Sequence, residues 1–288
     1  MHRRLFSKLI TYLFIFPCVH GLSAEENFLL INGMTDEVIT ELGPNIHKQM
    51  SPCSTFKIPL SLMGYDAEVL KDEIHPTWDF QEGYDDWLEP WRVAQSPSSW
   101  MQYSCVWYSK VLSLELGLRK IQHYFTSIEY GNQNASGGLA DPGPLDPFWI
   151  NSSLEISPKK QVDFLKKMVR AQLPISSRAI QMTKVLIFKE ELPEGWKLFG
   201  KTGWSGSSIT KDGNTLEHSW FVGWIEKDND FYPFAYLIRD KKINLDQRIP
   251  RVKQLLVESK VISSLASLVR ANTLKNSSLN RGDSPLRS

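Results

Sequence analysis

Pro52-Cys53-Ser54-Thr55-Phe56-Lys57 is the stretch of this 288-residue chain on which its fold assignment depends. Ser54 and Lys57 stand three residues apart, so a helix beginning near Ser54 would place both side chains on one face. The N-terminus of such a helix offers backbone N–H groups and partial positive charge, which favour an oxyanion. Apolar residues from Phe56 to Met63 predict burial, and burial lowers the pKa of a lysine. The stretch therefore pairs a nucleophilic hydroxyl with a base.

A simpler interpretation is that Ser54 caps a helix while Lys57 extends its ammonium to solvent. Two later motifs favour the catalytic interpretation. Ser104-Cys105-Val106 supplies a second serine, and Lys201-Thr202-Gly203 directly precedes a run typical of antiparallel strands. Penicillin-recognising acyl enzymes combine Ser-x-x-Lys with a second serine motif and Lys-Thr-Gly.

The bulk composition limits the partners that we expect. With 33 basic and 32 acidic residues the formal net charge is +1, which gives no reason to expect nucleic acid or an anionic membrane as partner. Ten tryptophans and a length of 288 residues indicate a packed protein with a sizeable core. No metal-ligand spacing is present, so we expect no metal.

Residues 1–24 read as a secretory signal peptide. A basic N-terminal region precedes an apolar run from Leu9 to Val19, and Leu22-Ser23-Ala24 has the small residues typical of the end of a signal peptide. An uncleaved anchor is the alternative, but the apolar run is short for a membrane span. We therefore expect a soluble periplasmic protein that has no membrane contact after cleavage.

Two cysteines, Cys53 and Cys105, remain after this segment, each beside a candidate serine. An oxidising compartment would permit a disulfide between them. The geometry of a disulfide is demanding, and we expect two buried, unreactive thiols instead.

The order of periodic segments predicts an α+β fold. A hairpin (28–31 and 38–42, turning at Asn32-Gly33) is followed by helical segments, and three strands (197–202, 219–226 and 231–239) and a helix at 249–261 come last. This order predicts an antiparallel sheet flanked by helices, with an inserted all-helical part.

Between the hairpin and the late strands we expect an irregular stretch (67–98) and helices at 119–128, after Ser157-Pro158 and at 177–192, with Ser98-Ser99 capping a further one. The catalytic domain is predicted at 25–271, with a mixed part at about 25–60 and 193–271 and a helical part at about 61–192. Residues 272–288 are predicted to be a flexible polar tail.

Five ordered elements together resemble the class D serine β-lactamases of the oxacillinase type, and the similarity spans roughly residues 27–261. These elements are Ser54-Thr55-Phe56-Lys57, Ser104-Cys105-Val106, Tyr130-Gly131-Asn132, Trp149 and Lys201-Thr202-Gly203. The resemblance implies the penicillin-recognising fold, hydrolysis of β-lactam antibiotics through a serine acyl-enzyme, and resistance to penicillin-type drugs.

The resemblance also implies a role for each residue at the base of the site. Ser54 is the nucleophile, and Lys57, carboxylated on Nζ by CO2 or bicarbonate, is the general base. Val106 and Ile150, with Phe56, would supply the apolar pocket that keeps the Lys57 amine neutral. The indole N–H of Trp149 would stabilise the carboxylate, although Trp149 as a plain core aromatic is the alternative.

The remaining residues would bind the substrate. Ser104 would pass a proton to the leaving ring nitrogen, and Lys201 would hold Ser104 and the substrate carboxylate. Thr202 and Gly203 would lie along the strand edge, and the backbone N–H groups of Ser54 and Trp204 would form the oxyanion hole. The substrate carboxylate would bind Arg248, with Arg239 as the alternative.

Two related proteins share the motifs but have different functions. A β-lactam-sensing domain keeps its acyl group, and such sensors carry several membrane spans ahead of the domain, where this chain has only a short apolar segment. Penicillin-binding transpeptidases are usually anchored and larger. The sequence leaves open whether the protein is a monomer or a homodimer, and the inserted loop 141–147 leaves the substrate range open.

Overall fold

The computed structural model describes residues 24–138, 147–209 and 215–262. Most of the predicted signal peptide, the inserted loop from Asp141, the expected turn at 211–214 and the tail 272–288 lie outside these residues. Within them no helix combines the length and the apolar character that a membrane crossing requires.

The described residues form one seven-stranded antiparallel sheet, as the sequence predicts. The late strands form an antiparallel meander, and the N-terminal hairpin adds to it through the pairing of β1 with β7. The order across the sheet, with β5 (Ser208–Ile209) pairing with β6, is β2 (Val38–Leu42), β1 (Glu25–Ile31), β7 (Asp230–Asp240), β6 (Thr215–Lys227), β4 (Lys197–Trp204) and β3 (Phe188–Glu191).

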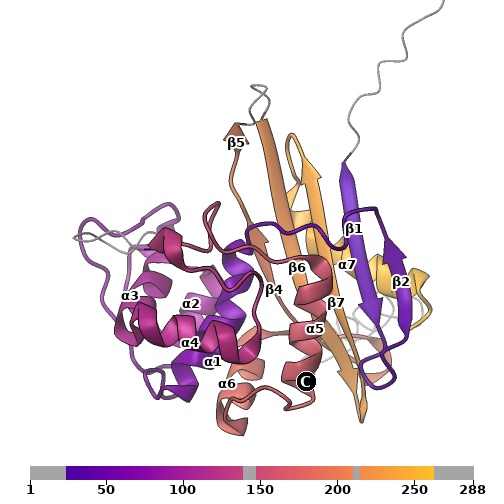
Figure 1. Ribbon diagram of the computed structural model, residues 1–288, viewed down its shortest axis with the longest axis horizontal. Helices are drawn as coiled ribbons and strands as arrows, with labels where there is room; N and C mark the ends of the chain where they lie inside the picture. Colours follow the sequence, from indigo (N-terminus) through magenta and orange to yellow (C-terminus); the bar gives the residue numbers. More distant parts are fainter. Residues whose placement is uncertain (1–23, 139–146, 210–214, 263–288) are drawn as a thin grey trace, which may run out of the picture.

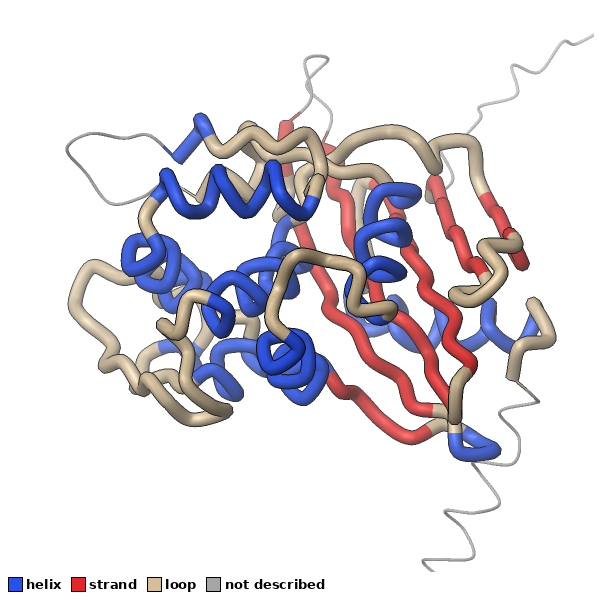
Figure 2. The backbone as a smooth tube through the Cα atoms, turned by 60° about the horizontal axis from the view of Figure 1, so that its bottom comes forward, coloured by secondary structure: helices blue, strands red, loops and turns tan. Residues whose placement is uncertain are grey.

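Helices cover both faces of this sheet, so the central strands are buried on both sides (Figure 1). In β1, Phe28 and Leu30 enter one hydrophobic cluster and Leu29 and Ile31 the other, because successive side chains of a strand point to opposite faces. The first cluster lies under α7 (Arg248–Glu258). The second cluster includes residues of two helices packed on the sheet, α5 (Pro158–Val169) and α6 (Ser177–Ile187). It also includes residues of the helices grouped beside the sheet in Figure 2, which are α1 (Lys57–Asp66), α2 (Pro97–Tyr103), α3 (Val106–Leu116) and α4 (Leu118–Ile128).

Helix α1 is the central helix of the larger cluster. Nine consecutive residues from Lys57 to Tyr65 are buried. A single turn of 3-10 helix, η1 (Cys53–Phe56), leads into it, so Ser54 belongs to this turn and α1 itself begins at Lys57. Four other short 3-10 turns are η2 (Glu89–Trp91), η3 (Ser136–Gly138), η4 (Pro193–Gly195) and η5 (Leu245–Gln247).

Two local expectations are wrong. The helix expected at 177–192 ends at Ile187, and the next four residues form β3, because backbone pairing with β4 outweighs local helical preference there. Helix α2 is capped by Ser96, whose side chain accepts from the Ser99 N–H, and Pro97 occupies the first turn. The expected cap residue Ser99 instead donates back to the cap.

Helix α5 starts as predicted, because the Ser157 side chain accepts a hydrogen bond from the Lys160 N–H and Pro158 follows it. We expect Ser157→Ala to lower the free energy of unfolding by about 1 kcal/mol, because the Lys160 N–H in the first turn of α5 loses its capping partner. Urea denaturation measures this change. The exposed Ser152→Ala serves as the control, and equal midpoints for the two variants would contradict the capping role.

Candidate active site

Lys57 is almost fully buried at the start of α1, and its amine faces Ser54. The side chain is 1% exposed, and Nζ lies 3.5 Å from Ser54 Oγ. Burial lowers the pKa of Lys57 to about 7, while the nearby thiols of Cys105 and Cys53 act weakly in the opposite direction. A neutral amine is therefore available near physiological pH, next to a hydroxyl that it can deprotonate.

The second serine and the second lysine form a contact across the cleft. Lys201 Nζ donates to Ser104 Oγ at 2.8 Å. Ser104 ends α2 with a left-handed backbone (φ 60°), which directs its side chain out of the helix. Burial, followed by repulsion from Lys57, Lys189 and Arg248, sets the pKa of Lys201 well below its usual value. The two motif pairs therefore form one electropositive cluster.

The edge of β4 beside this cluster is open. β3 pairs with β4 only as far as Phe199, so no strand of the described residues pairs with residues 200–204 on that side. Ser205 N–H donates to His218 O, and the register of β4 on β6 continues without a bulge. Because antiparallel pairs alternate, Thr202 and Trp204 direct their backbone N–H and C=O groups away from β6, towards the open edge.

Gly203 lets η1 approach β4 closely. A Cβ at this position would lie 2.8 Å from Pro52 O, 3.1 Å from Thr55 Cγ2 and 3.2 Å from Ser54 N. The backbone of Ser54 is therefore in near contact with the strand that carries Trp204. This proximity places the backbone nitrogen of Ser54 beside the strand on which the Trp204 N–H faces outward, so the two N–H groups predicted to form an oxyanion hole belong to adjacent segments.

Trp149 is fully buried, and its indole N–H has no hydrogen-bond partner in the described part of the chain. The ring stacks on Phe56 at 5.2 Å between centroids. Its backbone carbonyl accepts from Cys53 N–H and from Ser51 Oγ, both at 2.8 Å. A buried donor without an acceptor is costly, so this N–H is poised for a further anionic or polar group.

Val106 is buried and Ile150 half-buried, and both pack in the same hydrophobic cluster as Phe56. The Trp204 side chain is 43% exposed, and its indole donates to Glu217 Oε2 at 3.2 Å. Val106 and Ile150 therefore belong to the apolar core that also holds Phe56, whereas the Trp204 ring lies on the opposite face of the sheet from Lys201.

Of the two arginines, Arg248 is the one near the site. Its Nη1 donates to Gly203 O at 3.3 Å and to Ser219 Oγ at 3.1 Å, which places the guanidinium beside β4. Arg239 is paired with Glu25 at 3.2 Å, on the pairing between β1 and β7. The structure therefore favours Arg248 as the arginine available to a ligand.

The two cysteines are free and buried. Burial raises the pKa of the Cys53 thiol to about 12 and that of Cys105 to about 11, so both are protonated and poor nucleophiles at neutral pH. Among the described residues, no group of acidic, histidine or cysteine side chains has the arrangement of a metal site.

Several site neighbours escaped the sequence analysis. Ser51, Asn151, Ser205 and His218 bond to the segments that carry Trp149, Ser54 and Trp204. Lys189, on β3, contributes to the repulsion on Lys201. No periodicity or motif marks these residues, because their contacts arise only when distant segments meet.

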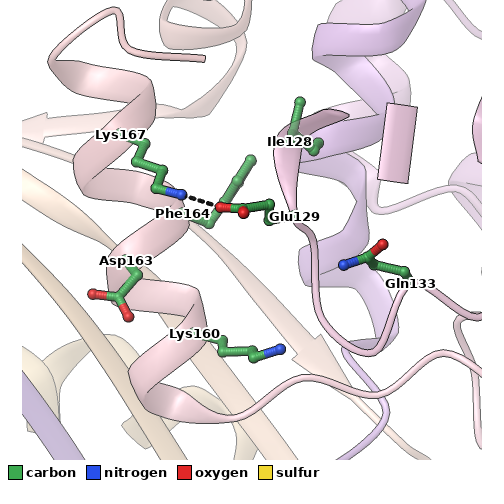
Figure 3. A pocket seen from close by; sticks show the side chains of 7 residues that line it. All are labelled: Ile128, Glu129, Gln133, Lys160, Asp163, Phe164 and Lys167. Carbon is green, nitrogen blue, oxygen red and sulfur yellow. Dashed lines mark hydrogen bonds and ion pairs between the residues drawn. The ribbon is translucent and has the colours of Figure 1, made fainter. Parts of the chain in front are cut away.

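A separate hollow of about 300 Å³ lies between the end of α4 and α5 (Figure 3). None of the motif residues line it. Its charged groups are engaged with protein partners, since Lys167 pairs with Glu129, Lys160 donates to Gly131 O, and Asp163 pairs with Lys159. We therefore assign no chemistry to this hollow.

The chain is similar to known proteins over most of its length. The family model described as the penicillin binding protein transpeptidase domain matches residues 34–256. Beta-lactamase OXA-9 of Klebsiella pneumoniae is 34% identical over 238 residues, covering 81% of this chain and 86% of the relative. Beta-lactamase OXA-1 of Escherichia coli is 37% identical over 211 residues, covering 72% and 74%.

A solved structure agrees as well. The crystal structure of the OXA-427 class D beta-lactamase superposes with a TM-score of 0.72 at 32% identity, covering 81% of this chain and 99% of that one.

We expect Gly203→Ala to reduce turnover by about a hundredfold, because the added methyl group displaces η1 and with it Ser54. Steady-state kinetics with a chromogenic substrate measure the effect. Gly33→Ala is a matched control, since its methyl group would meet the Phe231 ring away from the site. A Gly203→Ala enzyme as active as Gly33→Ala at equal thermal stability would refute the close-approach argument.

Proposed function

This chain belongs to the class D β-lactamases, and on that premise we propose that it hydrolyses β-lactams through an acyl-enzyme on Ser54, with carboxylated Lys57 as the base. The observation that carries the proposal is the buried Lys57 amine 3.5 Å from Ser54 Oγ. No other lysine in the described part of the chain lies within hydrogen-bonding distance of that hydroxyl.

Acylation uses groups on both sides of the cleft. Ser54 Oγ loses its proton on the Lys57 side and attacks the lactam carbonyl. The N–H groups of Ser54 and Trp204 stabilise the oxyanion, and Ser104 gives a proton to the departing ring nitrogen. Lys201, which already donates to Ser104 Oγ, orients that serine and lowers the barrier to its proton transfer.

The surroundings of Lys57 fit a carboxylated amine. Reaction with carbon dioxide requires a neutral amine, and burial makes Lys57 neutral near pH 7. The product carries an anion that needs a donor, and the indole N–H of Trp149 is a buried donor without an acceptor among the described residues. Carbon dioxide bound to Nζ would supply the carboxylate that serves as base for Ser54 and for the deacylating water.

The substrate carboxylate would bind at the end of β4. The guanidinium of Arg248 lies beside Gly203 O, and the ammonium of Lys201 lies on the other side of the same strand. The outward backbone groups of Thr202 and Trp204 would bind the acylated substrate as an additional strand.

We further propose that residues 1–24 direct the chain to the periplasm and are then removed. The apolar run from Leu9 to Val19, preceded by basic residues and followed by small residues, supports this. The mass of the protein recovered from a periplasmic extract tests the proposal, and recovery of the full 288-residue chain in the membrane fraction would refute it.

Ser54→Ala should reduce the turnover of a chromogenic cephalosporin by at least about a thousandfold, because it removes the nucleophile. The wild-type chain should turn over many equivalents. Wild-type labelling by fluorescent penicillin at one equivalent without turnover would contradict hydrolysis and indicate a sensor or transpeptidase instead.

The activity should depend on pH and bicarbonate together. With a Lys57 pKa of about 7, the neutral fraction falls to about a tenth at pH 6, so carboxylation is lost as the pH decreases. We expect activity at pH 6 to be restored by added bicarbonate.

Lys57→Ala should still permit some acylation, more slowly than in the wild type because the base for Ser54 is lost, but it should stall before hydrolysis and should not respond to bicarbonate. Mass spectrometry of the acylated protein measures this. A wild-type pH profile unchanged by bicarbonate would exclude the carboxylated lysine.

A further inference from the structure

Ser51 joins the segment that leads to Ser54 with the segment that carries Trp149. Its hydroxyl donates to Trp149 O at 2.8 Å and accepts from Asn151 N–H at 2.9 Å. Ser51 is buried, so these bonds are screened little by water. One hydroxyl therefore fixes the backbone on both sides of Ile150.

The same residues connect to the end of β4 and close a ring. Asn151 Nδ2 donates to Ser205 O at 2.7 Å, and Ser205 Oγ accepts from His218 N–H at 2.9 Å. The His218 ring returns to the start, with Nε2 at 2.9 Å from Ser51 O. We call Ser51, Asn151, Ser205 and His218 the Ser51 ring.

The chemistry of the acceptor assigns the tautomer of His218. Because a carbonyl oxygen only accepts, His218 must carry its proton on Nε2. Burial lowers the pKa of His218, which keeps the ring neutral in this arrangement. Ser51 O also accepts from Trp220 Nε1 at 2.9 Å, and Cys53 Sγ lies 3.5 Å from His218 Nε2.

The orientation of the Trp149 indole depends on this anchor. Its aromatic contacts are stacking on Phe56 and an edge contact with Phe148, and neither contact gives the indole N–H a hydrogen-bond acceptor. The directional contacts of Trp149 are the two hydrogen bonds to its carbonyl, from Cys53 N–H and Ser51 Oγ. An N–H that must meet an anion on Lys57 requires a fixed direction.

We propose that the Ser51 ring fixes the indole N–H of Trp149 in the direction that a carboxylate on Lys57 requires and thereby sets the affinity of Lys57 for carbon dioxide. The proposal rests on the carboxylation proposed above. Ser51 and Asn151 act through Trp149 and contact neither the substrate nor the reacting atoms.

The test compares Ser51→Ala with Ser61→Ala. Ser61 is a matched control, a fully buried serine of α1 whose hydroxyl bonds Thr183 Oγ1 at 2.9 Å away from the ring. In 13C-bicarbonate, the carboxylated lysine gives its own carbonyl resonance, whose intensity is titrated against bicarbonate. We expect Ser51→Ala to need about tenfold more bicarbonate for half-maximal signal, because two hydrogen bonds are lost, and Ser61→Ala to match the wild type.

The half-maximal bicarbonate concentration for turnover at pH 6 should shift in parallel, while kcat at saturating bicarbonate should recover. Asn151→Ala, at an exposed position, removes the hydrogen bond to Ser205 O and should raise the half-maximal bicarbonate concentration as well. If Ser51→Ala does not fold, Asn151→Ala tests the ring proposal in its place. A wild-type signal with unshifted ring variants would overturn the ring proposal alone. A wild type without any carboxylated-lysine signal would overturn carboxylation, and the ring proposal with it.

Discussion

The burial of the Lys57 amine is the constraint on which the rest of the site depends. A lysine that starts the central helix of a hydrophobic cluster must either pair with an anion or give up its proton, because an isolated ammonium is costly in such surroundings. In the described part of the chain it forms no ion pair, and its pKa falls to about 7. Burial thus removes the hydration that would stabilise the ammonium and leaves a reactive amine beside Ser54.

The other cations of the site follow the same pattern. Lys201 and Arg248 approach the open end of β4, and both have lowered pKa values, mainly through burial. Their hydrogen bonds in the described residues go to hydroxyl and carbonyl oxygens, so neither forms an ion pair there, and only the nearby Asp246 offsets part of the charge of Arg248. Cations of this kind favour ligands with a carboxylate, and they lie beside a strand edge at which the backbone N–H groups of Thr202 and Trp204 face away from β6.

The sheet and the helical region contribute different parts of this arrangement. The sheet supplies the strand edge that carries Lys201 and Trp204. The helical region supplies Ser104, which follows the last residue of α2 and has a left-handed backbone conformation. Gly203 permits the two to meet at backbone distance. The Ser51 ring then connects the third segment, around Trp149, to both. Precise placement of these parts therefore comes from hydrogen bonds between segments that are far apart along the chain.

The sequence by itself determined the motif residues, the N-terminal hairpin, the late meander and the Ser157 cap, because each depends on local periodicity, turn chemistry or short spacing. Only the tertiary structure decided that residues 188–191 form a strand, that Arg248 and not Arg239 lies at the site, and that Cys53 and Cys105 remain unbridged. It also decided the contacts of Ser51 with His218. These features depend on pairings between distant segments, whose partners no local pattern identifies.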